Sequence, residues 1–319
     1  MTPVKNTHEV LHNVNIFLDR IIPVTTPLGV VIGFLFPGFF IHLRPFVPLL
    51  FGIITFSGAL KLTVSEFGKT IKSPSPILLF FLCAHVIMPL AAMFVSSLFF
   101  DNQDVVAGFV LLFSGPTAVS CFIWVSIFKG DMALCLTLIL LDTILAPLVV
   151  PGSVSLLMGT KIAMDMSGIA VSLLLMIVIP TIIGVTVNET TKSRIPAVLS
   201  PWLNPFAKIC LFTVIAANVA VIAPRIRFDD PLVWKTAVIV ILLTAAGFLL
   251  IKLVTVIVKC RHPKDITVII SGGLRNNSAV MTIAVTFFPE AAVIPTLVCL
   301  IFQQSITAVM GKIFTKKAE

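Results

Sequence analysis

The sequence predicts an all-α polytopic membrane protein whose ten transmembrane helices form two inverted five-helix repeats. Composition is the first reason: 58% of the 319 residues are hydrophobic and 11% are charged, against about 45–50% and about 25% in soluble domains. The second reason is a series of ten apolar runs with short loops between them. The third is a polar patch that recurs at matching places in the two halves. Together these observations exclude an ordinary soluble protein and a disordered chain.

Ten apolar runs, bounded by charged residues, proline or glycine, are long enough to cross a bilayer, which takes about 20 helical residues. The predicted spans, numbered 1 to 10 in chain order, cover residues 21–41, 46–64, 76–99, 104–127, 131–157, 162–186, 204–223, 232–257, 264–287 and 291–311. Because the loops are short, the backbone polar groups must be satisfied within helices or packed protein.

The formal charge of +8 indicates loops that face anionic lipid and the cytoplasm, and no nucleic-acid partner is expected. Lys and Arg residues are roughly three times as frequent in the loops on the N-terminal side of the membrane as on the other side. This asymmetry predicts a multi-pass protein of the cell inner (plasma) membrane with both termini in the cytoplasm. An even number of spans agrees with that orientation.

Spans 4 and 9 each contain a polar patch with Gly or Pro in mid-span, at Ser114–Ser120 and Ser271–Asn277. Each patch is followed by an acidic residue, Asp131 or Glu290, and then by a similar Ala and Thr-Leu pattern. The spacing is close to half the chain, and five spans per half invert the second half relative to the first. Inverted repeats with a broken helix in each half are typical of secondary transporters; a pair of ordinary kinks is the alternative. The predicted repeats are residues 1–160 (spans 1–5) and 161–319 (spans 6–10).

Arg275 is the most informative residue, since a charge in mid-span costs about 2.5–3.5 kcal/mol on insertion scales. Asp142 in span 5 is the one acidic residue deep in a span. Three interpretations of Arg275 stay open: an ion pair with Asp142, a site for a substrate carboxylate or phosphate, and a built-in cation that replaces a bound sodium ion. Asp142 is correspondingly a fixed counter-ion or a proton carrier.

Neutral polar residues in the two breaks and in span 10 complete the candidate substrate- or ion-binding set. They either line a solute path or hydrogen-bond freed backbone and neighbouring helices. His85 in span 3 could relay protons, although a structural role in a packed bundle is the preferred interpretation. The chain shows no ATP-binding motif, no catalytic set and no metal-ligand spacing among its six Cys residues. An enzyme is therefore not expected. The set is Thr117, Ser120, Asp142, Ser271, Arg275, Asn276, Asn277 and Gln303.

A series of motifs, in order along nearly the whole chain, resembles the bile acid:sodium symporter family. They are Phe56–Phe67, Ile87–Pro89, Lys129–Leu134 with Ala146–Pro147, and Gly273–Asn276. The resemblance implies a panel domain of spans 1, 2, 6 and 7 and a core domain of spans 3–5 and 8–10. It also implies that the broken spans 4 and 9 cross, and that the family's activity is import of organic anions with sodium.

Several positions depart from what the resemblance implies for sodium binding. The family has Gln at the position of Ala84, Glu at that of Ser271 and Gln at that of Arg275. In span 5 its sodium-side Ser and Thr fall at Cys135 and Ile139. A guanidinium repels sodium, so sodium coupling is in doubt and the built-in cation interpretation of Arg275 gains support.

The predicted function is therefore a secondary active transporter that moves an organic anion by alternating access, with the substrate held between the two domains beside the crossing of spans 4 and 9. Alternatives are a proton-coupled or uncoupled efflux carrier of the metabolite or arsenite type, and a membrane ligand sensor without transport. The expected partners are a small organic anion and membrane lipid. The sequence leaves the substrate, the direction of transport and the oligomeric state open.

Overall fold

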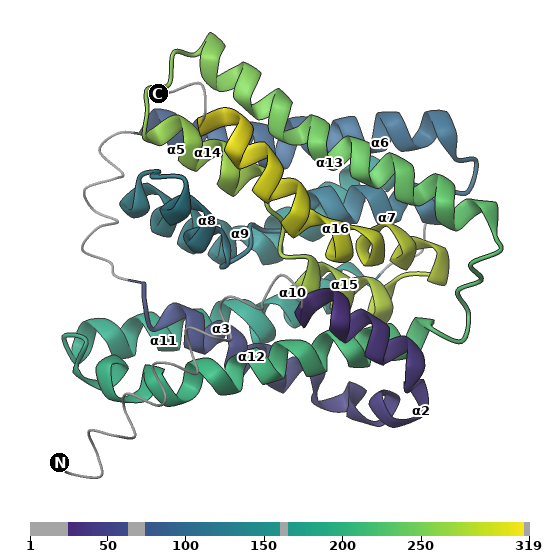
Figure 1. Cartoon of the computed structure of the whole chain (residues 1–319), viewed down its shortest axis with the longest axis horizontal. Helices are drawn as coiled ribbons and strands as arrows, with labels where there is room; N and C mark the ends of the chain where they lie inside the picture. The colour runs from purple at the N-terminus through teal and green to yellow at the C-terminus, as the bar shows by residue number, and fades with distance from the viewer. Residues whose placement is uncertain (1–24, 63–73, 160–164, 316–319) are drawn as a thin grey trace. The chain divides into compact units, whose positions relative to one another are not determined.

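A computed structural model describes residues 25–62, 74–159 and 165–315, and these residues form helices joined by turns (Figure 1). Within those ranges no strand occurs, and the one β-type element is an isolated bridge between Thr117 and Arg275. The predicted all-α class is confirmed.

Seven helices are long and apolar enough to cross a membrane, which gives the chain the character of a multi-pass membrane protein. Three shorter apolar helices fall within the predicted spans 1, 4 and 9: Thr25–Leu35, Gln103–Ser114 and Asn277–Phe287. Residues 21–24 and 63–64 of the predicted spans 1 and 2, and 162–164 of span 6, lie outside the described residues. The seven long helices are Pro37–Ala59, Pro74–Phe99, Met132–Met158, Met166–Thr190, Arg194–Ile222, Pro231–Ile257 and Glu290–Thr315.

The chain divides into two compact units. One comprises Met1–Val64 and Leu174–Pro224, and the other comprises Ser65–Leu173 and Arg225–Glu319. One division falls inside the helix Met166–Thr190, where α10 (Met166–Leu173) meets the π-helical segment η4 (Leu174–Val178). The predicted boundary between the two repeats, at residues 160 and 161, lies outside the described residues, so the repeats stay a prediction.

The first unit contains α3 (Val47–Ala59) packed against α11 (Ile179–Thr190) and α12 (Arg194–Ile222). Its other described elements are the helix Thr25–Leu35, α2 (Pro37–Phe40), the 3-10 helix η1 (Ile41–Phe46) and η4. Polar side chains bond across these helices: the Ser57 hydroxyl donates to Asn204 Oδ1 at 3.0 Å, and Asn188 Nδ2 donates to the Leu62 carbonyl at 2.9 Å. None of the candidate site residues lies in this unit.

The second unit holds every candidate site residue. Several of its helices begin at a residue whose side chain accepts a backbone N–H of the first turn, namely Asn102, Asp131, Asp230 and Asn276, which is the usual way to satisfy a helix N-terminus. Its elements are α5 (Pro74–Phe81), the π-helical segment η2 (Leu82–Ile87), α6 (Met88–Phe99), α7 (Gln103–Ser114), α8 (Cys121–Ile127), α9 (Met132–Met158), α10, α13 (Pro231–Ile257), α14 (Lys264–Gly273), α15 (Asn277–Phe287) and α16 (Glu290–Thr315).

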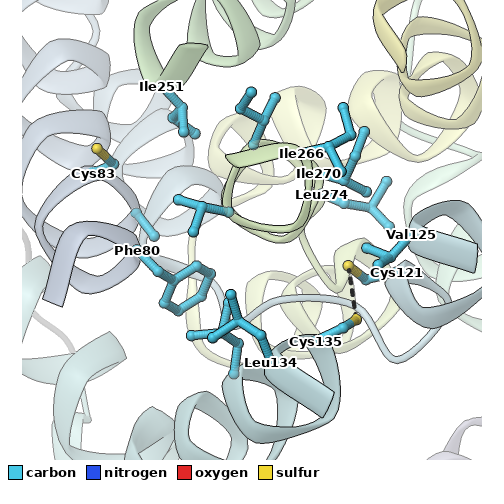
Figure 2. Close-up of a cluster of buried hydrophobic side chains, with 14 of the residues drawn as sticks. Phe80, Cys83, Cys121, Val125, Leu134, Cys135, Ile251, Ile266, Ile270 and Leu274 are labelled. Carbon is cyan, nitrogen blue, oxygen red and sulfur yellow. Dashed lines mark hydrogen bonds between the residues drawn. The ribbon is translucent and has the colours of Figure 1, made fainter. Parts of the chain in front are cut away.

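Helix α14 lies at the centre of a buried apolar cluster in this unit. Figure 2 shows Ile266, Ile270 and Leu274 of this segment surrounded by side chains of α5, η2, α8, α9 and α13. Consecutive residues Val268, Ile269 and Ile270 are all fully buried, as expected of a helix that is packed on every side. The polar break that follows α14 therefore adjoins closely packed apolar side chains.

Helices α7 and α16 approach each other closely at Gly108. A Cβ atom on Gly108 would overlap the backbone of Ala292 on α16, so only glycine fits at this contact. Because α7 leads into one break and α16 carries Gln303, this contact fixes two parts of the candidate site relative to each other.

Candidate functional site

Two interrupted helices meet in the middle of the second unit. Helix α7 ends at Ser114 and α8 begins at Cys121, while α14 ends at Gly273 and α15 begins at Asn277. We call the two intervening segments, residues 115–120 and 274–276, the crossing. They pair as antiparallel strands do: the Ala118 N–H donates to the Leu274 carbonyl at 3.1 Å and the Asn276 N–H donates to the Pro116 carbonyl at 2.8 Å. The non-helical backbone is thus satisfied within protein, as it must be in a bilayer.

The guanidinium of Arg275 joins the crossing to a third helix. Its Nη1 donates to the Gly115 carbonyl at 3.1 Å, and its Nη2 donates to the Ala84 carbonyl in η2 at 2.7 Å. The side chain is buried, since Arg275 is 2% exposed. The cation therefore binds two main-chain carbonyl oxygens from segments distant in sequence.

The Ala84 carbonyl is available because of local sequence. In η2 the Met88 N–H donates to the Cys83 carbonyl, five residues earlier, which is π-helical pairing. The next donor in that register is residue 89, and Pro89 has no N–H. The Ala84 carbonyl is consequently left without a helical partner, and Arg275 supplies one.

Gln303 of α16 holds the backbone of Arg275. Its Oε1 accepts the Arg275 N–H at 3.2 Å, and its Nε2 donates to the Arg275 carbonyl at 2.8 Å. Gln303 is 2% exposed. The Gln303 amide therefore bonds to the backbone of the crossing as a neighbouring strand would, and it joins α16 to residues 274–276.

Asp142 of α9 binds the other face of the crossing. Its Oδ2 accepts the backbone N–H of Thr117 at 2.6 Å, and its Oδ1 lies 2.7 Å from Nε2 of His85. Among the described residues no ion pair joins Asp142 to Arg275, so the structure does not show the direct pair that was one of three interpretations of Arg275. The two opposite charges instead contact neighbouring residues of one segment, Gly115 and Thr117.

His85 is the residue that sequence reasoning undervalued. Its side chain is 6% exposed and lies against the rings of Phe80 and Phe81, with centroid distances of 6.0 and 5.5 Å. Although Nε2 is close to Asp142, the contact lacks the alignment of a hydrogen bond, and Nδ1 has no hydrogen-bond partner. A buried carboxylate and a buried imidazole thus lie in contact without forming an aligned hydrogen bond. The only feature of the sequence that pointed to His85 is the presence of a polar side chain in an otherwise apolar span.

The remaining candidates divide by whether their side chains are used. The Thr117 hydroxyl donates to the Ser271 and Leu274 carbonyls at 2.6 and 3.0 Å, and the Ser271 hydroxyl lies 3.1 Å from Cys121 Sγ. These two side chains stabilise the break. In contrast, Ser120 is half-buried with no side-chain cap bond, and both polar atoms of the buried Asn277 amide lack a hydrogen bond of acceptable geometry. The Asn276 side chain accepts the Ala279 N–H at 3.3 Å.

A cavity of about 330 Å³ lies elsewhere in this unit, between α13, α14 and α16. Lys252, His262 and Asp265 are its ionisable lining residues, and none of the eight candidate site residues lines it. His262 Nδ1 lies 3.4 Å from Asp265 Oδ1 with half of the His262 side chain exposed. This outer His–Asp contact is a natural comparison for the buried contact between His85 and Asp142.

Comparison with known proteins agrees with the motifs. Residues 47–226 match the model of the sodium bile acid symporter family. The chain is 35% identical over 290 residues to the uncharacterized protein YbaS of Bacillus subtilis, covering 91% of this chain and 95% of YbaS. It is 20% identical over 311 residues to YocS of the same organism, described as an uncharacterized sodium-dependent transporter, covering 98% and 96% of the two chains. It is 28% identical over 253 residues to the human ileal sodium/bile acid cotransporter, covering 76% and 70%.

Proposed function

The chain belongs to the sodium bile acid symporter family, and from this premise we propose that it carries a small organic anion across the membrane by alternating access, with the guanidinium of Arg275 in place of a bound sodium ion. The family is one of transporters, not enzymes. The ileal relative is named for bile acid and sodium, and this name is the reason for choosing an organic anion as the substrate class.

The observation that carries the proposal is the pair of hydrogen bonds from Arg275 to the Gly115 and Ala84 carbonyls. In transporters with broken helices, unwound backbone carbonyls are the groups that coordinate sodium. Here the Ser271, Leu274, Pro116 and Arg275 carbonyls accept bonds from protein donors as well. The backbone carbonyls that could bind a sodium ion are therefore already hydrogen-bonded to protein donors. The Arg275 guanidinium supplies a permanent positive charge in place of the ion.

Three candidate residues retain unused hydrogen-bonding capacity beside the crossing, and we assign the substrate contacts to them: Ser120, Asn276 and Asn277. Thr117, Ser271 and Gln303 stabilise the breaks, and Arg275 contributes positive potential without direct contact, because both of its carbonyl bonds lie in buried protein. In a low-dielectric interior that potential still favours an anion nearby.

Ten helices in two inverted repeats remain our proposal for the complete architecture, with spans 1, 2, 6 and 7 as the panel and spans 3–5 and 8–10 as the core. It is supported by helix breaks at matching places in the two halves and by a compact unit that contains residues of spans 1, 2, 6 and 7. The excess of Lys and Arg on the N-terminal side supports an inner (plasma) membrane location with both termini cytoplasmic. Reporter fusions at the two termini test that orientation.

Thermal unfolding of the purified protein in detergent tests the absence of a sodium site without a known substrate. The melting temperature is compared in sodium chloride and in choline chloride at equal ionic strength. A ligand at about 100 times its dissociation constant stabilises the folded state by about 2.7 kcal/mol, so an occupied sodium site is readily seen. We expect equal melting temperatures in the two salts. A higher melting temperature in sodium chloride than in choline chloride, seen in the wild-type protein and in the surface control Arg225→Gln, would refute the proposal.

A further inference from the structure

We propose that His85 and Asp142 form a proton-binding site and that a proton bound there is the coupling ion of this transporter. The inference rests on the proposed function, because it names the ion whose gradient drives transport in place of sodium. It begins from one juxtaposition: Asp142 Oδ1 lies 2.7 Å from His85 Nε2, with side-chain exposures of 0% and 6%.

The pair has polar atoms without hydrogen-bond partners, which a proton-binding site needs. The Oδ1 atom of Asp142 and both ring nitrogens of His85 lack a hydrogen bond of acceptable geometry. A buried polar atom without a partner is costly, by about 1–3 kcal/mol. A proton that forms an N–H bond on His85 or an O–H bond on Asp142, with a small realignment, turns this contact into a charge-assisted or neutral hydrogen bond. Water supplies and receives the proton, and nothing is oxidised or reduced.

The charges around the pair make a bound proton equivalent to a monovalent cation. With His85 neutral, the negative charge of Asp142 balances the positive charge of Arg275. Adding one proton to the pair leaves one net positive charge in the buried crossing. Since an isolated buried charge is expensive, this state is favoured when a monovalent organic anion is also bound. Proton and anion thereby stabilise each other.

Few other ionisable groups surround the pair. The crossing contributes Arg275, whereas α5, α6 and α10 carry no ionisable side chain. The ionisable residues of α7 and α14 lie in their first turns, at Asp104, Lys264 and Asp265. The thiols on the elements packed around the pair are Cys83 of η2, Cys121 of α8 and Cys135 of α9.

The pair is also connected to the helix break mechanically. The other oxygen of Asp142 accepts the Thr117 N–H at 2.6 Å, and His85 follows the residue whose carbonyl binds Arg275. Protonation of the carboxylate weakens its capacity to accept that N–H, since charged acceptors form hydrogen bonds roughly twice as strong as neutral ones. Proton binding therefore alters the contacts of the crossing where the substrate contacts are proposed.

Titration of the purified full-length protein tests the proton site with no substrate. Histidine ring carbons labelled with ¹³C report imidazole protonation, and the infrared carboxylic-acid band reports Asp142. His85→Gln and Asp142→Asn identify the signals. The titration covers about pH 5 to pH 9, and we expect a pH-dependent signal from this pair in the wild-type protein that differs in Asp142→Asn. His262, in contact with Asp265, is the matched control and keeps its titration in both variants. A folded wild-type protein in which neither signal changes over this range would overturn the proposal.

Uptake into proteoliposomes tests the coupling. Taurocholate is the probe because its sulfonate stays ionised and cannot cross the bilayer as a neutral acid. One proton per anion is electroneutral, so a gradient of one pH unit supports about tenfold accumulation that does not respond to membrane voltage. We expect this accumulation to be lost in His85→Gln and Asp142→Asn and kept in His262→Gln. Uptake that ignores the pH gradient in the wild-type protein would overturn proton coupling.

The two proposals fail in different ways. Uptake driven by a sodium gradient contradicts the proposed replacement of sodium by Arg275, and absence of any uptake contradicts the organic-anion assignment. The titration needs neither ion gradient nor substrate, so it judges the proton site independently.

Discussion

The side-chain amide of Gln303 bonds to both backbone polar groups of Arg275, accepting its N–H at 3.2 Å and donating to its carbonyl at 2.8 Å. The orientation of the buried guanidinium therefore depends on a residue of α16, in addition to its own contacts with Gly115 and Ala84. Helix α16 thus positions the charge that defines the site, although it contributes no charge of its own there.

Replacing Gln303 with Leu is expected to destabilise the protein and to impair transport. The change leaves the buried N–H of Arg275 without its partner, at about 1–3 kcal/mol, whereas the Arg275 carbonyl still accepts the Asn277 N–H at 2.9 Å. Gln304→Leu is the matched control, because Gln304 Oε1 accepts the Trp124 indole N–H at 2.8 Å and does not touch Arg275. Melting curves and uptake assays of both variants check this. Equal losses of uptake in the two variants would argue against a positioning role for Gln303.

Arg275→Ala is expected to abolish transport, folding or both, because it removes two charge-assisted hydrogen bonds and leaves two buried carbonyls unpaired, at about 3 kcal/mol or more. Arg275→Lys keeps the charge but not the planar fork that spans two acceptors, so an intermediate melting temperature is expected. Thermal unfolding in detergent measures both. Transport at the normal rate by a well-folded Arg275→Ala protein would refute the assignment of Arg275 to the site.

Asp142 and Arg275 are expected to be energetically coupled although they do not form a pair. Asp142→Asn is destabilising when Arg275 is present. In the Arg275→Ala background it is neutral or stabilising, because it removes a buried charge that has lost its balance. A double-mutant cycle of melting temperatures should show a coupling of about 0.5–3 kcal/mol. Additive effects of the two substitutions would contradict the charge balance on which the proton site depends.

Gly108→Ala is expected to be strongly destabilising, because the added Cβ overlaps the Ala292 backbone and forces α7 away from α16. Overpacking of this kind costs about 1–3 kcal/mol or more. Gly152 on α9 has nothing within 4 Å of an added Cβ, so Gly152→Ala should be neutral or stabilising by up to about 1 kcal/mol. A lower melting temperature for Gly108→Ala than for Gly152→Ala is the expected result; equal values would contradict the close approach.

Composition and hydropathy were sufficient to predict the helical membrane class, and the Gly and Pro residues of spans 4 and 9 were sufficient to predict where two helices are interrupted. Both signals are local, since they depend on neighbouring residues alone. The importance of Arg275 could also be predicted, because an intramembrane charge is costly wherever it lies.

The partners of the charges could not be predicted. Arg275 donates to main-chain carbonyls, which every residue has. The amino-acid types at positions 115 and 84 therefore do not indicate that Gly115 and Ala84 are its acceptors. Only the combination of a π-helical turn with Pro89 singles out the Ala84 carbonyl, and the turn is not evident from sequence. The contact of Asp142 with His85 joins positions far apart in the chain, and three interpretations of Arg275 stayed open because the sequence does not show which groups lie beside a buried charge.

The crossing is closed by main-chain hydrogen bonds between residues 116–118 and 274–276. Main-chain bonds survive substitution of the side chains that flank them, so the scaffold tolerates variation at Ser120 and Asn277, whereas Asn276 also caps α15 with its side chain. Substitution of a few neutral side chains beside the crossing can therefore change what this protein binds without breaking the main-chain bonds that hold the two segments together. The residues proposed to contact the substrate are thus different from His85 and Asp142, which are proposed to bind the coupling proton.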